Sequence, residues 1–416
     1  MVTVKASILD RAFAGSRIYV FVGPARLRTP EAVRASLRSL ARQGPQNRVG
    51  LTPSSHSRWA FDPESMDAWS VERESVGARA LDVVEELMQL GVRPSPAPVV
   101  VRMKGNHALF SFDHGLGDAH FMNELSALCT GDDDAVQRWR PATVTAHPAS
   151  SALASAVAEH PVGVFGGLGA LIRDRITVGK GREQSEDDGT RRGLIATPAV
   201  AFATSQAGYA DGLREVVAQG PQASLMSTVI VATIRAFENR GVLPRPEAVI
   251  MVDLRRYLRP GSHTLANFVS SVSVPTAAGT LPHDVDRRLR GELDSFRPLL
   301  KHCRQEVTHV LPRNDGEVLQ TGGGGASLVF SEGTPARVGA KYAWDLAAGP
   351  PTLAATLTLQ RDDQISVFIS RLPGGIVQMC ASFFQECHVP ESVRGALNDV
   401  LVDPNWAAAV AAIGQR

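Results

Sequence analysis

The stretch at residues 107–128, HALFSFDHGLGDAHFMNELSAL, constrains the fold more than any other part of the chain. Its residues up to Phe112 are apolar, aromatic or small, which predicts a buried strand. From Phe121 onward the apolar residues recur at helical spacing, so a helix is expected there. The loop between them contains two glycines that allow a tight turn, so His114 could be held at the mouth of a cleft.

His114 and Asp118 are the chemically active residue types of this loop. A neutral histidine on a loop suits general-base chemistry, because its unperturbed pKa lies near working pH. Asp118 follows four residues later and has two possible roles. It either orients the loop by pairing with a distant cation or caps the helix that begins beside it. The pattern alone does not decide between a catalytic and a structural histidine.

This stretch resembles the His-x-x-x-Asp-Gly signature of the chloramphenicol-acetyltransferase-like superfamily. The group includes BAHD acyltransferases, peptide-synthetase condensation domains, and wax-ester or polyketide-associated acyltransferases. On this resemblance His114 falls on the catalytic histidine and Asp118 on the structural aspartate. Two positions depart from the pattern. Asp113 stands where many members have the first of two histidines, and Ala119 replaces the usual glycine.

A second segment, residues 252–256 with the sequence VDLRR, resembles another element of the same superfamily. Members there have Val-Asp-x-Arg or Val-Asp-Leu-Arg, followed by Gly-Asn. Here Ala266 precedes Asn267 in place of the usual glycine. The resemblance implies that Arg255 reaches Asp118 and locks the His114 loop. A planar guanidinium can hold a carboxylate through two parallel hydrogen bonds. Read alone, the segment would fit equally well a surface arginine pair that ends a strand.

A third segment, residues 328–335 with the sequence LVFSEGTP, resembles a cleft-lining turn of related acyltransferases. Ser331 could donate a hydrogen bond to a developing oxyanion there, or simply cap a turn. Asp113, Gly117 and Asn267 are the other candidates for substrate or oxyanion contacts. The Asp-Phe-Gly-Trp-Gly element of BAHD enzymes is absent from the sequence.

A metal site is not expected at this loop. His114, Asp118 and His120 lie close together in the sequence, but no further ligand is spaced to join them. The sequence also lacks a Gly-x-Gly-x-x-Gly motif and a phosphate-binding loop, so it suggests no nucleotide site.

Length and charge narrow the class of protein further. A chain of 416 residues suits two lobes. Its 43 basic and 42 acidic residues nearly cancel, which argues against a nucleic-acid-binding face. The four cysteines show neither metal-ligand nor paired spacing, so reduced cytosolic thiols are expected.

The N-terminus lacks a secretory apolar core, and the small-residue stretch 150–172 is interrupted by Glu159, so we expect a soluble cytoplasmic protein with no transmembrane segment.

The pattern of apolar residues alternates between strands and helices in both halves of the chain. The charged, glycine-containing segment at 181–193 reads as an exposed linker, which divides an N-terminal lobe (1–180) from a C-terminal lobe (194–416). Strands are predicted at 17–22, 99–103, 107–112, 199–204, 248–252, 267–274, 328–330, 353–359, 365–371 and 376–383. Helices are predicted at 30–43, 81–90, 223–239 and 390–400, with one or two more at 284–309 broken at Pro298.

The resemblance implies an α/β (α+β) fold of two chloramphenicol-acetyltransferase-like lobes. Each lobe would be a mostly antiparallel sheet with flanking helices, and an active-site channel would run between them. It further implies an acyltransferase of specialised or lipid metabolism, with His114 as general base. The donor would be acyl-CoA or a phosphopantetheine-linked acyl thioester, and the acceptor a small molecule with a hydroxyl or an amine.

No permanently bound cofactor is expected, and we expect a monomer that interacts with an acyl carrier protein only if that is its donor. Two alternatives remain open at this point. One is a free-standing condensation enzyme that joins carrier-bound substrates. The other is a non-catalytic relative that binds a carrier or a small molecule, which the departures at Asp113 and Ala119 keep open.

Overall fold

The fold is described from a computed structural model of the chain. The structure describes residues 2–64, 69–74, 81–92, 96–131, 143–144, 148–181, 197–218, 223–308, 324–334 and 342–411. The strands are β1 (Val2–Lys5), β2 (Arg17–Gly23), β3 (Leu51–Thr52), β4 (Arg58–Phe61), β5 (Ser70–Glu74), β6 (Val99–Lys104), β7 (His107–Asp113), β8 (Thr143–Val144), β9 (Pro198–Thr204), β10 (Glu247–Asp253), β11 (Ser262–His263), β12 (Val269–Pro275), β13 (Ser327–Thr334), β14 (Thr352–Ala355), β15 (Gln364–Leu372) and β16 (Ile376–Phe384).

The helices are α1 (Ile8–Phe13), α2 (Pro30–Arg42), α3 (Val83–Val92), α4 (Ala119–Thr130), α6 (Pro148–Glu159), α7 (Pro161–Gly181), α8 (Tyr209–Ala218), α9 (Leu225–Asn239), α10 (Pro282–Asp294), α11 (Arg297–Thr308), α13 (Pro390–Val402) and α14 (Pro404–Ala411). Two short 3-10 turns matter for the site, η3 (His114–Leu116) and η4 (Leu254–Tyr257).

The first sheet has five strands in the order β14-β2-β7-β6-β5. All neighbours are antiparallel except β5 and β6. The predicted hairpin of β6 and β7 is confirmed, with Val99 opposite Phe112. Helix α2 starts as its sequence predicts, because the Thr29 side chain accepts the N–H of Ala32 and Pro30 occupies the first turn. Its apolar stripe, with that of α4, packs into the core of this sheet.

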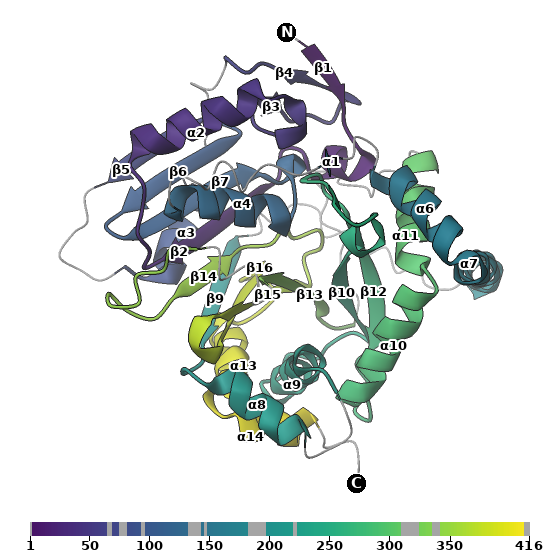
Figure 1. The fold of residues 1–416 in the computed structure, drawn as a ribbon. Coiled ribbons are helices and arrows are strands. Elements are labelled where there is room, and N and C mark those ends of the chain that lie inside the picture. The colour runs from purple at the N-terminus through teal and green to yellow at the C-terminus, as the bar shows by residue number, and fades with distance from the viewer. Residues whose placement is uncertain are drawn as a thin grey trace.

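The second sheet has six strands in the order β12-β10-β13-β15-β16-β9. Strand β13 is parallel to both of its neighbours, and the other pairs are antiparallel. Helices α8, α9, α13 and α14 lie together on one side of it (Figure 1). The structure thus confirms the expected mixed α/β architecture with two mostly antiparallel sheets.

The two halves of the chain are interleaved. Strand β14 comes late in the sequence, yet it pairs with β2 at the edge of the first sheet. The expected linker at 181–193 lies, apart from Gly181, outside the described residues. The division into lobes at 180 and 194 therefore stays a prediction.

Helices α6 and α7 have no counterpart among the predicted elements. Their apolar residues lie on all sides and are mixed with glycine and alanine, so they form no amphipathic stripe. Among the described residues no single helix is long and apolar enough to cross a bilayer. Helices α6 and α7 meet that criterion only as a pair bent by 118°.

The break between α10 and α11 lies earlier than predicted. The two helices are separated at Ser295 and Phe296, and Phe296 has a positive φ of 56°. Pro298 instead occupies the first turn of α11, where its missing N–H costs nothing.

Candidate active site

The His114 loop joins β7 of the first sheet to α4. The turn η3 begins directly after Asp113, whose carboxylate accepts the N–H of Gly115 at 2.8 Å and the N–H of Gly15 at 2.9 Å. Burial raises the pKa of Asp113, and these two N–H groups oppose the rise. Asp113, which departs from the family pattern, thus caps the turn. Its predicted contact with a substrate stays a prediction.

The imidazole of His114 is held in one orientation. Its Nδ1 lies 3.0 Å from the carbonyl oxygen of Gly117, and its ring stacks on Phe13 with the centroids 4.2 Å apart. A carbonyl oxygen can only accept, so Nδ1 carries the proton and Nε2 of the neutral ring has a free lone pair. The ring is closely surrounded by protein, which lowers the pKa of His114, yet the residue retains some accessible surface. This neutral tautomer is the form that a general base requires.

Gly117 occupies a position with no room for a side chain. A Cβ atom there would lie 2.4 Å from the carbonyl oxygen of Leu265 and 2.5 Å from Cβ of Phe121. Both are far inside van der Waals contact, and the first is backbone that cannot turn aside. Gly117 therefore lets the loop pass close to the segment that precedes β12.

Asp118 is held by Arg255 through a two-point ion pair. Nη1 of Arg255 lies 2.9 Å from Oδ2 of Asp118, and Nη2 lies 3.1 Å from Oδ1. Asp118 also accepts the N–H of His120 at 2.9 Å, as a cap of α4, and the N–H of Phe268 at 3.1 Å. Both roles considered for Asp118 therefore hold at once. Each partner of the ion pair is less than a tenth exposed, so water weakens the interaction little.

Arg255 comes from the second sheet, since η4 follows β10 directly. Its guanidinium also donates to the carbonyls of Thr264 and Ala266, both at 2.8 Å, and to Oδ1 of Asp253 at 3.1 Å. Asp253, at the end of β10, accepts the backbone N–H of Arg255 at 2.9 Å and lies 3.3 Å from Nε2 of His120. Burial alone would raise the pKa of Asp253, but His120 and Arg255 outweigh it and the pKa falls well below its usual range. These contacts join the end of the second sheet to the loop from the first.

Asn267 lies beneath the loop and is 1% exposed. Its side-chain amide donates to the carbonyl of His114 at 2.8 Å and to Oδ1 of Asp10 at 3.0 Å. Asn267 thus holds the backbone of His114 through its side chain. Its predicted contact with a substrate stays a prediction.

Two functional candidates, Asp10 and Arg48, have no signal in the sequence motifs. Asp10 is buried in α1 and accepts the backbone N–H of Asn267 at 3.0 Å. Arg48 lies 2.9 Å from Asp10 and donates to the carbonyls of Gly115 and Leu116 at 2.8 and 2.9 Å. Arg48 and Asp10 thus hold the His114 loop from the side of the first half of the chain, and Arg255 holds it from the second sheet.

Ser331 is on β13, where it pairs with Phe368 of β15. Within the described part of the chain no hydrogen bond joins Ser331 to His114, so its oxyanion role stays a prediction. Strand β13 does reach α4, because the side chain of Asn123 donates to the carbonyl of Gly333 at 2.9 Å.

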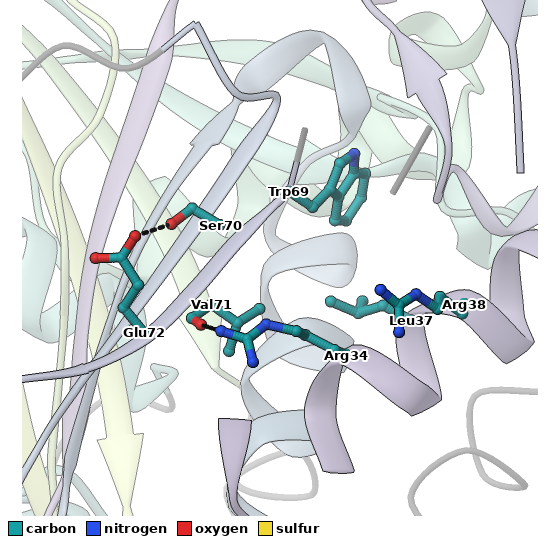
Figure 2. Close-up of a pocket in the computed structure, with 7 residues that line it drawn as sticks. All are labelled: Arg34, Leu37, Arg38, Trp69, Ser70, Val71 and Glu72. Atoms are coloured by element: carbon teal, nitrogen blue, oxygen red, sulfur yellow. Dashed lines mark hydrogen bonds between the residues drawn. The ribbon is translucent and has the colours of Figure 1, made fainter. Parts of the chain in front are cut away.

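A small hollow between α2 and β5 is separate from this loop. It has a volume of about 240 Å³ and is lined by Arg34, Leu37, Arg38, Trp69, Ser70, Val71 and Glu72 (Figure 2). The lining groups bond to one another: Ser70 donates to Glu72 at 2.7 Å, and Arg34 donates to the carbonyl of Val71. The hollow contains none of the residues of the His114 loop, and we assign it no part in the chemistry.

Solved structures with the same fold cover the whole chain. No protein-family model matches the sequence, and no curated protein sequence does either. The trichothecene 15-O-acetyltransferase TRI3 from Fusarium sporotrichioides matches 100% of this chain and 96% of its own length, with a TM-score of 0.61 at 11% identity. The first condensation domain of the calcium-dependent antibiotic synthetase, solved with a substrate analogue, covers 99% and 96% with a TM-score of 0.61 at 13% identity.

A third neighbour is F. sporotrichioides TRI101, whose structure holds coenzyme A and T-2. It matches 93% of this chain and 96% of its own, with a TM-score of 0.52 at 13% identity. At these identities the likeness concerns the fold. Acetyltransferases and peptide-synthetase condensation domains both share that fold, and the sequence motifs at His114 and Arg255 point to the same group. The chain has the fold of the chloramphenicol-acetyltransferase-like superfamily, in which BAHD-type acyltransferases and condensation domains are grouped.

Proposed function

We propose that this protein is an acyltransferase that moves an acyl group from a thioester to a hydroxyl or amine, with His114 as the general base. One observation carries the proposal. The bond from Nδ1 of His114 to the carbonyl of Gly117 leaves Nε2 as an acceptor, on a loop tied to both sheets. Fixing both the tautomer and the position of an imidazole is what proton abstraction requires.

The proposed reaction needs no covalent intermediate on the protein. Nε2 of His114 takes the proton of the acceptor hydroxyl or amine while the acceptor's oxygen or nitrogen attacks the thioester carbonyl carbon. The tetrahedral intermediate then collapses, the carbon–sulfur bond breaks, and the imidazolium returns the proton to the departing sulfur. Because both substrates would be positioned beside one loop, much of the acceleration would come from orientation.

The donor is an acyl thioester of coenzyme A or of a phosphopantetheine arm. This part of the proposal is supported by the neighbours, since one is an acetyltransferase solved with coenzyme A and another is a condensation domain. Asp118, Arg255, Asn267, Asp10 and Arg48 would act as positioning residues. Ser331 remains the candidate donor to the oxyanion. Two lobes, 1–180 and 194–416, a monomeric state and a cytoplasmic location complete the proposal.

The test is release of free thiol from a panel of acyl-CoA thioesters and acyl-pantetheine thioesters, with and without hydroxyl and amine acceptors. The proposal expects thiol release that depends on the acceptor and an acylated product that mass spectrometry identifies. Thioester binding with no turnover on this panel, and none with carrier-bound acyl groups either, would contradict it and favour a non-catalytic relative.

A condensation enzyme is the second candidate, because one of the structural neighbours described above is a condensation domain with a TM-score of 0.61. The same assay separates the two functions. Turnover with carrier-bound acyl groups but not with acyl-CoA or free pantetheine thioesters would identify the condensation enzyme.

A further inference from the structure

Side chains of β12 alternate between two environments. Val272 and Val274 are buried in the core that contains α9, whereas Ser271 and Ser273 are half-buried. Successive side chains of a strand point to opposite faces of the sheet. The two serines therefore mark a polar, partly open face of the second sheet, on the side away from α9.

Ser271 belongs to a row of half-buried side chains that crosses three strands. It lies opposite Met251 of β10. The parallel register that pairs Ile250 with Phe330 places Met251 beside Ser331 of β13. Residues that lie side by side on paired strands share a face of the sheet. The candidate oxyanion donor Ser331 is thus in the same row as Ser271.

This face of the sheet borders the His114 loop. Asp253 lies on the same face at the end of β10, and its carboxylate is 3.3 Å from Nε2 of His120 in the first turn of α4. The side-chain amide of Asn267 donates to the carbonyl of His114 at 2.8 Å. Ser271 follows Asn267 by four residues, which is about 13 Å of extended strand. One small substrate can therefore extend from the loop to Ser271.

The ammonium of Lys301, on α11, lies at the end of this row. It donates to the hydroxyl of Ser271 at 2.8 Å and is half-buried. Among the described residues, no carboxylate lies within ion-pair distance of it. A cation that leaves water without a counter-ion costs free energy, and an incoming anion recovers part of that cost.

The charges around Lys301 also favour an anion. Glu292 has a carboxylate whose charge reaches Lys301. That carboxylate is already bound by Arg288 at 3.2 Å and by Arg297 at 3.1 Å. Burial and the nearby guanidinium of Arg304 both lower the pKa of Lys301, since each disfavours the ammonium. A bound anion would oppose both effects.

We propose that the ammonium of Lys301 and the hydroxyl of Ser271 bind a carboxylate of the substrate, and that this contact selects the substrate. The inference rests on the proposed acyl transfer and adds a substrate class to it, namely an acyl group or an acceptor that bears a carboxylate. Because Lys301 donates to the oxygen of Ser271, the hydroxyl proton is free to donate in turn. Two neighbouring donors match the two oxygens of a carboxylate.

The test is calorimetric binding to the full chain, without turnover, of two matched pairs of probes. Glutaryl-CoA and valeryl-CoA differ by a carboxylate on the acyl chain, and 4-hydroxyphenylacetate and its methyl ester differ by a free carboxylate on the acceptor. We expect the wild type to bind the charged member of one pair about tenfold or more tightly than the neutral member. The pair that shows this preference identifies which substrate carries the carboxylate.

Lys301→Met should abolish the preference, and Ser271→Ala should reduce it by a smaller factor. The matched control is Lys5→Met, on an exposed lysine of β1, which should bind all four probes like the wild type. Equal binding of the charged and neutral members of both pairs by the wild type, or no binding of any probe, would overturn the inference. An equal loss of affinity of Lys301→Met for glutaryl-CoA and valeryl-CoA would also overturn it, because the lysine would then bind the phosphates of coenzyme A.

Thiol release separates this inference from the proposed function. A wild-type protein that prefers the charged probe but releases no thiol from any thioester, carrier-bound ones included, would refute the acyl transfer and leave the carboxylate site standing. A protein that transfers acyl groups with no preference for charge in binding would refute the carboxylate site alone.

Discussion

Nδ1 of His114 lies 3.0 Å from the carbonyl oxygen of Gly117, so the imidazole and the glycine of the loop form one unit. The glycine fixes the tautomer of the imidazole, and its lack of a side chain lets the loop approach Leu265. A substitution of Gly117 would therefore change the orientation of the His114 imidazole without contacting a substrate.

Gly117→Ala should lower the rate of thiol release by about a hundredfold, because the added Cβ forces the carbonyl away from His114 and a shift of about 1 Å has that effect. It should also lower the melting temperature, since the new atom meets backbone. Gly166→Ala is the matched control, because a Cβ there meets nothing within 4 Å. Equal rates for the two variants would show that the loop tolerates the methyl group.

Arg255→Ala should destabilise the protein by about 3–5 kcal/mol in urea unfolding, because it leaves the buried carboxylate of Asp118 without its cation. The double variant Asp118→Asn/Arg255→Ala should lose less unfolding free energy than the two single variants lose together. The difference, which is the coupling free energy, should be about 1 kcal/mol or more. The exposed neighbour Arg256 provides the control, and Arg256→Ala should change stability little. Strict additivity in the double-mutant cycle would argue against the ion pair.

Arg48→Met tests the support behind the loop. The substitution removes the donors to the carbonyls of Gly115 and Leu116 and leaves the Asp10 carboxylate without its cation. We expect kcat to fall by about tenfold or more with a smaller change in KM, because Arg48 acts on His114 through the backbone. Compared with Arg48→Met, Arg48→Lys should regain more of the stability than of kcat. Its single ammonium group can pair with Asp10, but it cannot replace the planar set of N–H donors of a guanidinium. Arg42→Met, on an exposed side chain, should match the wild type.

His302 should make stability depend on pH. It is 2% exposed, and burial lowers the pKa of His302 to about 4, whereas the unfolded chain takes up the proton near 6.5. Between these pH values the unfolded state binds more protons, so this contribution to stability is complete above about pH 6.5 and declines as the pH falls toward 4. Lowering the pH from 7 to 5 should cost about 2 kcal/mol through this group. Urea titrations of His302→Leu should show a loss of unfolding free energy between pH 7 and 5 that is smaller by this amount than the loss in the wild type. An equal loss in both proteins would exclude His302 as the cause.

Local patterns were enough to predict most strands and helices, because each has its own periodicity and caps. The hairpin that delivers His114 and the helix α9 with its Ser224 cap are examples. The approach of Arg255 to Asp118 was implied by two motifs that resemble known ones. No sequence pattern predicted that Asp10 and Arg48 pair beside the His114 loop, since two opposite charges far apart in the sequence have no characteristic spacing. The helix α7 was missed for another reason, because its apolar residues do not follow one face: Val164 is buried, whereas Phe165 and Ile172 are exposed.

The central claim is that Nε2 of His114 accepts the proton of the attacking group. Its most direct test is the rate of thiol release by His114→Ala, measured in single turnover on the thioester that the wild type uses best, beside the exposed control His56→Ala. The account predicts that His114→Ala keeps the wild-type fold and melting profile but loses transfer by about a hundredfold or more, while His56→Ala retains the wild-type rate. A folded His114→Ala variant that transfers acyl groups at the wild-type rate would contradict it.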